Sequence, residues 1–204
     1  MLFDDSYRTI ETPAEGLYRE RGSKFLAFAY PVTGEEDLKN YITSLKQDHP
    51  KANHHCWALR LTPDRSVFRF NDDGEPSGTA GRPILNTLLS HDLTNIAVIV
   101  VRYFGGTLLG VPGLINAYKT AAEESIKQST IIEKTVNDVY ILQFDYLQTN
   151  DIMRLIKDDS LQILEQQFDN KCEIQVSIRK TQVNRTLDKA GKIPGVIARY
   201  KYTI

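Results

Sequence analysis

The hydrophobic positions in the first part of the chain follow two periods, one typical of strands and one typical of helices. Residues 16–21 and 23–32 are rich in aromatic and apolar residues and meet at Gly22 and Ser23, a pattern that predicts a hairpin. In residues 34–49 the apolar positions return every three or four residues, which predicts an amphipathic helix whose inner face holds Leu38, Tyr41, Ile42 and Leu45.

The alternation of strands and helices continues to residue 127. Two short strands are expected at 54–62 and 66–72, and a helix follows over 79–92. Six consecutive apolar residues, 96–101, begin a strand that ends near Phe104, and such a run predicts burial on both faces of a sheet. A second long helix is expected over 111–127, with one side formed by Leu114, Tyr118, Ala121, Ala122 and Ser125.

A different order of elements begins after residues 130–137. Strands are expected at 139–146, 161–168, 172–178 and 196–202, helices at 150–158 and 183–190, and "FDNK" at 168–171 is typical of a hairpin turn. The order β-α-β-β-α-β is the split, ferredoxin-like pattern. We therefore predict the fold class α+β, with an N-terminal domain over 1–135 and a ferredoxin-like domain over 136–204.

Composition and charge narrow the class of protein. The chain has 204 residues, of which 41% are hydrophobic and 25% charged, and its formal net charge is −1. This balance argues against a globally basic nucleic-acid binder. Residues 1–13 are mixed and acidic, unlike a cleaved leader, and the longest apolar run is too short to span a bilayer. We expect a soluble cytoplasmic protein with no membrane partner.

Positive charge gathers in one C-terminal segment. Residues 179–201 contain a single anion, Asp188, and seven cations: Arg179, Lys180, Arg185, Lys189, Lys192, Arg199 and Lys201. A solvated helix and edge strand would explain this segment without further function. Clustered cations on one face are also the footprint of phosphate binding, so the same seven residues are candidate nucleic-acid contacts.

The stretch "NDDGEPSGTAGRP", residues 71–83, is the first candidate for chemistry. It places three carboxylates, Asp72, Asp73 and Glu75, beside two hydroxyls, Ser77 and Thr79, in a turn before a helix. Either hydroxyl could cap that helix. The carboxylates could hold Mg²⁺ or Ca²⁺, but their spacing matches no calcium loop, so we expect no metal site. They could also pair with a nearby cation, Arg102 or Arg82.

The stretch "VVRYFGGTLLGVPGLINAY", residues 100–118, is the second candidate. A strand that passes through Gly105 and Gly106 into a helix exposes backbone N–H groups, and such helix starts attract anions. Arg102 could add a forked donor for phosphate or carboxylate. Alternatively, the glycines make a tight connection and Arg102 pairs with an acid of residues 72–75. No dinucleotide or Walker fingerprint is present.

The histidines and cysteines give weaker signals. Two distant cysteines, Cys56 and Cys172, make neither a disulfide framework nor a zinc ligand set. On a strand, His55 and Cys56 point to opposite sides, so His55 is a poor base for a Cys56 nucleophile and a buried structural cysteine is the better interpretation. We expect no metal and no cofactor.

The two long motifs, together with "KANHHCWALRL" at 51–61, resemble the Impact family, which has bacterial members of the YigZ type, and the resemblance extends along the whole chain. His54 matches the family histidine. Where the family reads Leu-Gly-x-Gly-Gly-Leu, this chain has Pro112 in place of the first glycine of the pair. Proline removes one backbone donor from an anion site that would use that N–H, although it suits the first turn of a helix.

The resemblance implies an N-terminal two-layer α/β domain, like the second domain of a small-subunit ribosomal protein. It also implies a C-terminal domain similar to the last domain of elongation factor G. The eukaryotic relatives modulate the amino-acid-starvation response by competing for a translation-linked activator of an initiation-factor kinase. The candidate cleft then consists of residues from both motifs and the family histidine: His54, Asp72, Asp73, Glu75, Ser77, Thr79, Arg102, Gly105 and Gly106.

Three functions follow as hypotheses. The first is a non-enzymatic binding protein or regulator linked to translation, which contacts RNA or the ribosome. The predicted third strand of the C-terminal domain, "CEIQVSI", has no aromatic residue for stacking bases, so we expect salt-sensitive contacts to the nucleic-acid backbone. The second is a regulator that binds another protein through its N-terminal domain. The third is an enzyme acting on a phosphorylated or carboxylated small molecule.

Overall fold

The computed structural model describes residues 5–168 and 171–204, and it divides into two compact units. The N-terminal unit is Tyr7–Lys134, and the C-terminal unit comprises 135–204 together with Asp5 and Ser6. The division falls beside the domain boundary predicted near residue 135, but the first described residues belong to the C-terminal unit. The tip of the turn predicted at 168–171 lies outside the described residues.

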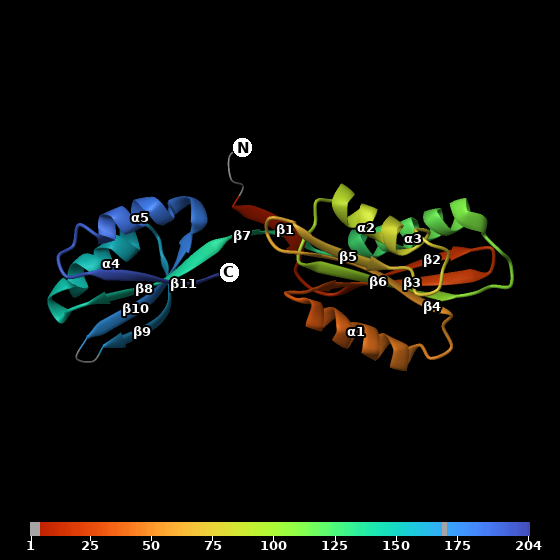
Figure 1. Cartoon of the computed structure of the whole chain (residues 1–204), viewed down its shortest axis with the longest axis horizontal. Coiled ribbons are helices and arrows are strands. Elements are labelled where there is room, and N and C mark those ends of the chain that lie inside the picture. The colour runs from red at the N-terminus through yellow and green to blue at the C-terminus, as the bar shows by residue number, and fades with distance from the viewer. Residues whose placement is uncertain (1–4, 169–170) are drawn as a thin grey trace. The chain divides into compact units, whose positions relative to one another are not determined.

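A five-stranded antiparallel sheet is the centre of the N-terminal unit (Figure 1). Its order is β2-β3-β6-β4-β5. The strands are β2 (Ala14–Glu20), β3 (Ser23–Pro31), β4 (His54–Leu61), β5 (Val67–Asn71) and β6 (Ile96–Tyr103). Each was predicted from the sequence to within two residues at either end. Strand β6 lies in the middle and carries Arg102 near its end, opposite His54 of β4.

Helices cover both faces of this sheet. Helices α2 (Gly81–Ser90) and α3 (Gly110–Lys127) pack on one face, and α1 (Glu35–Asp48) lies on the other, as Figure 1 shows. The predicted inner side of α3 is buried. Residues 96–101 of β6 are fully buried, as the unbroken apolar run predicted, because α1 covers the face that α2 and α3 leave open. The α+β class is confirmed. The N-terminal unit differs from the expected two-layer arrangement because α1 forms a third layer.

Two short strands were not predicted. Strands β1 (Ser6–Ile10) and β7 (Ile131–Thr135) pair with each other in a separate two-stranded sheet. Both have only five residues, and each mixes polar side chains with apolar ones. Such short segments carry too little periodicity to be distinguished from a loop.

The C-terminal unit has the predicted β-α-β-β-α-β order. Its four-stranded antiparallel sheet has the order β11-β8-β10-β9, and α4 and α5 pack on it. The bounds are β8 (Asn137–Phe144), α4 (Thr149–Asp158), β9 (Gln162–Phe168), β10 (Cys172–Arg179), α5 (Val183–Ala190) and β11 (Ile197–Thr203). The short 3₁₀ turns Tyr146–Gln148 and Lys180–Gln182 precede α4 and α5. The similarity of this unit to the last domain of elongation factor G stays a prediction.

No helix within 5–168 or 171–204 combines the length and the apolar character that crossing a lipid bilayer requires.

Candidate functional site

Asp72 holds the start of helix α2. Its carboxylate accepts hydrogen bonds from the backbone N–H groups of Gly78 (2.9 Å), Ala80 (3.1 Å) and Gly81 (2.8 Å). The N–H groups of Ala80 and Gly81 are donors that a helix start leaves without partners, and a negative charge there also suits the helix dipole. Asp72 is therefore a capping residue and does not line the cleft described below.

The two predicted capping hydroxyls do not cap α2. Thr79 is buried and its Oγ1 donates to the carbonyl of Pro76 at 2.6 Å, while Ser77 is exposed. The prediction of a hydroxyl cap was wrong because the chain turns back before the helix and brings the Asp72 carboxylate over the same N–H groups. An ionised acceptor forms the stronger hydrogen bonds.

Asp73 contacts two histidines and orients the ring of one of them, His54. Its carboxylate accepts the backbone N–H of His55 at 2.6 Å, and its carbonyl lies 2.8 Å from His54 Nδ1. A carbonyl oxygen only accepts, so Nδ1 of His54 carries the proton in this contact. The contact fixes the ring of His54 and directs its other nitrogen, Nε2, away from Asp73.

Glu75 and Arg102 form a buried ion pair. Arg102 NH1 lies 2.5 Å from Glu75 Oε1, and the two side chains are 6% and 4% exposed. The hydroxyl of Tyr118 donates to the same oxygen at 2.7 Å. The interpretation in which Arg102 pairs with an acid of residues 72–75 is thus confirmed. The guanidinium is not saturated, since its buried Nε has no hydrogen-bond partner among the described residues.

Two further ionisable groups lie beneath this pair, and both stay neutral. Burial raises the pKa of the Cys56 thiol and, more strongly, that of the Tyr118 hydroxyl. The nearby Glu75 charge acts in the same direction on both. The thiol donates to Tyr118 at 3.3 Å, and Tyr118 in turn donates to Glu75. Cys56 is therefore the buried structural cysteine that the sequence predicted.

The paired glycines after β6 have separate structural reasons. A Cβ on Gly105 would lie 2.0 Å from the carbonyl carbon of Gly22, so only glycine allows these two backbone segments to approach. Gly106 has open space but a φ of +85°, which favours glycine. The Gly105 N–H donates to Ser23 Oγ at 3.1 Å. Both glycines shape the turn, and neither lines the cleft.

A cleft of about 420 Å³ opens over the buried ion pair. Three of the nine predicted cleft residues line it: His54, Glu75 and Arg102. The other lining residues are Asn53, Pro76, Phe104, Leu108, Leu109, Gly110, Val111 and Leu114. The cleft therefore has a polar floor, made by residues of both sequence motifs, and largely apolar walls.

The apolar walls were not predicted as part of the site. Phe104, Leu108 and Val111 are 44%, 81% and 53% exposed, which is unusual for large hydrophobic side chains in so short a segment. The sequence had predicted an anion site at this place, formed by Gly105, Gly106 and the backbone N–H groups of the helix start. The available signal was the set of apolar residues after these glycines, in a connection that has to lie at the surface.

The start of helix α3 borders the same cleft. Leu109 precedes the helix without a side-chain cap, and Gly110 and Val111 line the opening. Pro112 is the third residue of the helix and has no N–H, so this end offers fewer donors than an ordinary helix start.

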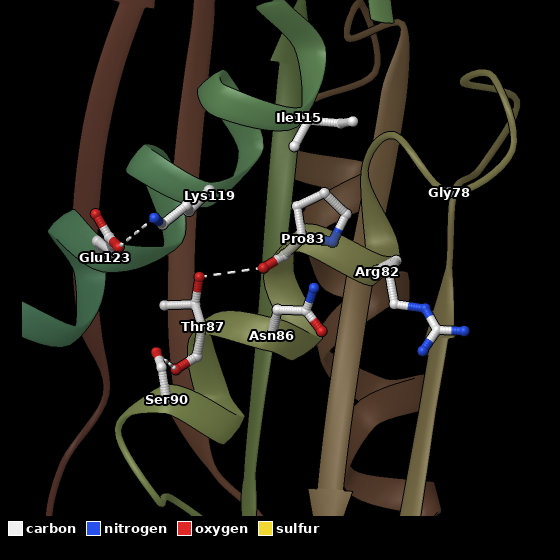
Figure 2. Close-up of a pocket in the computed structure, with 9 residues that line it drawn as sticks. All are labelled: Gly78, Arg82, Pro83, Asn86, Thr87, Ser90, Ile115, Lys119 and Glu123. Atoms are coloured by element: carbon white, nitrogen blue, oxygen red, sulfur yellow. Dashed lines mark hydrogen bonds and ion pairs between the residues drawn. The ribbon is translucent and has the colours of Figure 1, made fainter. Parts of the chain in front are cut away.

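A second hollow, of about 580 Å³, lies between helices α2 and α3 (Figure 2). Some of its polar side chains already have partners: Thr87 donates to the Pro83 carbonyl at 3.1 Å, and Lys119 lies 3.7 Å from Glu123. Ile115 borders this hollow one helical turn after Val111. Because none of the predicted site residues lines it, we take the first cleft as the candidate site.

The predicted nucleic-acid contacts are partly neutralised within the C-terminal unit. Arg179 makes two hydrogen bonds to Asp5, at 2.7 and 2.8 Å, and Thr181 also donates to that carboxylate. Hydrogen bonding to Arg179 holds the pKa of Asp5 far below its usual range, although burial opposes the effect.

A second carboxylate takes two more of the seven cations. Asp159 accepts a hydrogen bond from Lys189, and Arg185 lies 3.7 Å away. Lys201 donates to Gln175 at 2.8 Å. The segment is therefore not a uniform cationic face, and the exposed cations in it are Arg179, Lys180, Arg185, Lys192, Arg199 and Lys201.

Comparison with known proteins identifies the family. The model of the Impact N-terminal domain matches residues 21–126, which contain β3 to β6 and the whole cleft. The Impact family member YigZ of Escherichia coli K12 is 35% identical over 154 residues, covering 74% of this chain and 76% of the relative. The chain belongs to the Impact family.

Two solved structures extend this comparison. A protein of undescribed function is 29% identical and superposes with a TM-score of 0.71, covering 95% of this chain and 96% of the other. This likeness supports the same fold over both units. The second structure is that of Yih1, described as a two-domain translational regulator, which is 31% identical. The aligned region covers 63% of this chain and 49% of the Yih1 chain, with a TM-score of 0.36.

Proposed function

We propose that this protein is a regulator linked to translation that binds another protein through the cleft of its N-terminal unit. Membership of the Impact family supports the link to translation, since the resemblance described above implies that the eukaryotic relatives act on translation through a protein partner. The cleft lies within the segment that matches the Impact N-terminal domain. The partner is then expected to be a protein that acts on or with the ribosome.

The observation that carries the proposal is the exposed apolar rim of a cleft with a rigid polar floor. Leu108 is 81% exposed, and Phe104 and Val111 flank the same opening. Exposed apolar side chains that gather around a concave site are typical of protein interfaces, whereas single exposed ones are common everywhere. Ile115 continues the apolar surface along α3, so the rim is longer than the cleft itself.

The test is affinity capture from a cell lysate treated with RNase, followed by mass spectrometry of the captured proteins. Leu108→Ser removes apolar rim surface, and because Leu108 is exposed, we expect the variant to fold like the unmodified protein. Leu147→Ser is the matched control, because Leu147 is 88% exposed on the C-terminal unit. We expect a ribosomal protein or translation factor that the Leu108 variant loses and the Leu147 variant retains.

Two results would contradict the proposal. Equal capture by the Leu108 variant and the unmodified protein would mean that the rim takes no part in binding. Loss of every captured protein after RNase treatment would mean that RNA, and not a direct protein contact, joins this protein to the translation machinery.

Direct binding of RNA or the ribosome is the second candidate. The exposed side chains of Lys192, Arg199 and Lys201 favour it, because Asp159 and Asp5 leave these three cations unneutralised. Filter binding of structured RNA at two salt concentrations tests it: contacts to phosphates weaken steeply as salt rises. Binding that ignores salt, or none at low salt, would refute this candidate. Catalysis on an anionic small molecule stays a prediction that no contact described above favours.

A further inference from the structure

One hydrogen-bond acceptor of the polar floor is open to the cleft. Nδ1 of His54 donates to the carbonyl of Asp73, so Nε2 is the ring nitrogen that can accept a hydrogen bond from a ligand. The side chain is 24% exposed and lines the cleft, and Nε2 lies 3.8 Å from Glu75 Oε1. That separation is too long for a direct hydrogen bond, yet the carboxylate beside Nε2 favours an N–H or O–H donor there and disfavours a second acceptor.

The charges beneath the cleft select against charged ligands. Arg102 and Glu75 are more than nine-tenths buried and cancel one another. A carboxylate placed against His54 would approach Glu75 Oε1, which lies 3.8 Å from Nε2, and an ammonium would find no net negative charge because Arg102 pairs with Glu75. Either ion would also lose its hydration in a largely apolar cleft, which is costly without a partner of opposite charge. A neutral donor avoids both penalties.

The walls of the cleft favour a ligand in which the hydrogen-bond donor is attached to an apolar group. Phe104, Leu108 and Leu114 contribute large hydrophobic side chains, and the volume of about 420 Å³ exceeds what a small aliphatic group would fill. Indole and phenol combine a broad apolar ring with one polar hydrogen, and both require a hydrogen-bond partner when buried. Tryptophan and tyrosine are also the residues that most often anchor protein interfaces.

We propose that the cleft binds an aromatic side chain ending in a hydrogen-bond donor, a tryptophan indole or a tyrosine phenol, presented by the partner protein. The donor binds His54 Nε2, and the ring packs on the apolar walls. This inference rests on the proposed function and names the group by which the partner is recognised.

The experiment uses N-acetyl-tryptophanamide as a neutral probe, titrated into the millimolar range and followed by NMR of the full chain. The matched probe is N-acetyl-3-benzothienylalaninamide, which replaces the indole N–H by sulfur and keeps the shape. Both probes are titrated at the same pH. We expect chemical-shift changes at Asn53, His54 and Gly110. The sulfur probe should bind about tenfold more weakly, because it lacks the one hydrogen bond that the indole N–H donates to His54.

Charged probes and one metal complete the test. Indole-3-acetate adds a negative charge, and tryptamine adds a positive one. We expect both to bind more weakly than N-acetyl-tryptophanamide. The inference is overturned if either binds more tightly, if the two neutral probes bind equally, if no probe binds, or if Zn²⁺ binds His54 and displaces the neutral probe.

A variant separates the roles of the ring and the acceptor. His54→Phe keeps an aromatic ring and removes Nε2, so the two neutral probes should bind it equally. Fluorescence of Trp57, the single tryptophan of the chain, shows whether the variant is folded. The comparison of probes on the unmodified protein needs no variant. Failure of the probes with continued dependence of capture on Leu108 would reject this inference and leave the proposed function standing.

Discussion

The buried pair of Arg102 and Glu75 can be tested by a double-mutant cycle. Arg102→Met removes the cation and keeps an unbranched apolar side chain, and Glu75→Gln removes the anion and keeps the shape. Each single variant leaves one charge buried without its partner. The double variant leaves neither charge, so the cost of the second substitution should be much smaller than that of the first.

The expected magnitudes follow from the burial of the two side chains. Breaking a buried ion pair from one side costs about 3–5 kcal/mol of unfolding free energy. Tyr118 still donates to Glu75 after Arg102→Met, and the amide oxygen introduced by Glu75→Gln can still accept from Arg102. We therefore expect the lower end, about 3 kcal/mol, for each single variant. The double variant should lose about 4 kcal/mol, which gives a coupling energy of about 2 kcal/mol.

Urea unfolding followed by Trp57 fluorescence is the assay. Trp57 lies on β4, so its emission reports on the unit that contains the ion pair. With a slope of about 2 kcal/mol per molar urea, each single variant should lower the midpoint by about 1.5 M. Slopes should agree among the four proteins if only the native state is affected.

A surface pair on the same unit provides the control. Arg69 and Glu35 lie 2.7 Å apart, but their side chains are 62% and 42% exposed. The cycle Arg69→Met with Glu35→Gln should give a coupling below about 1 kcal/mol. Additive effects of the Arg102 and Glu75 substitutions, or a coupling no larger than that of the surface pair, would refute the reasoning that these charges depend on one another.

Three further predictions concern the frame of the site. Asp72→Ala should lower the unfolding free energy of the N-terminal unit by about 2 kcal/mol, measured by urea unfolding. The exposed control Ser77→Ala should change this free energy by less than about 0.5 kcal/mol. Equal effects would contradict the capping role of Asp72. Gly105→Ala should lower the unfolding free energy by about 3 kcal/mol or more in the same assay, because a Cβ there would clash with the backbone of Gly22. Gly106→Ala should cost about 1–2 kcal/mol because of its positive φ. The reverse order would contradict these reasons. Asp5 has a pKa lowered in the folded protein, so its stabilising contribution is complete above its ordinary pKa and is lost as the pH falls toward the folded value. Asp5→Asn should therefore lower the melting temperature followed by circular dichroism at pH 7 and have a smaller effect at pH 3, and a difference that does not shrink would contradict this assignment.

Local patterns predicted most of the fold because each main element carries its own period. The apolar run at 96–101 predicted a strand covered on both faces, and the structure places it at the centre of the sheet. The inner side of α3 likewise followed from helical spacing. Strands β1 and β7 escaped prediction because their pairing joins segments more than 120 residues apart, and neither segment has enough length to show a period.

The site was predicted less well, because the same residue types serve different purposes at short range. Asp72, Asp73 and Glu75 are equivalent in a sequence motif, yet one caps a helix, one orients a histidine and one neutralises Arg102. Only the path of the turn decides which carboxylate reaches which donor. Glycine is similarly ambiguous: Gly105 and Gly106 are required by close approach and by positive φ, and neither requirement involves a ligand.

The pair of Arg102 and Glu75 affects both the stability of the protein and the ligands that its cleft binds. The same two charges hold the floor of the cleft together and make its net charge zero. If neutrality selects the ligand, changing one charge should change the preferred probe. Glu75→Gln leaves the charge of Arg102 unopposed, so indole-3-acetate should gain affinity relative to N-acetyl-tryptophanamide. Arg102→Met leaves Glu75, so tryptamine should gain instead. Shifts in opposite directions cannot result from a general loss of stability, which would weaken all probes together. Shifts in the same direction would mean that the floor acts through shape and that its charge does not select the ligand.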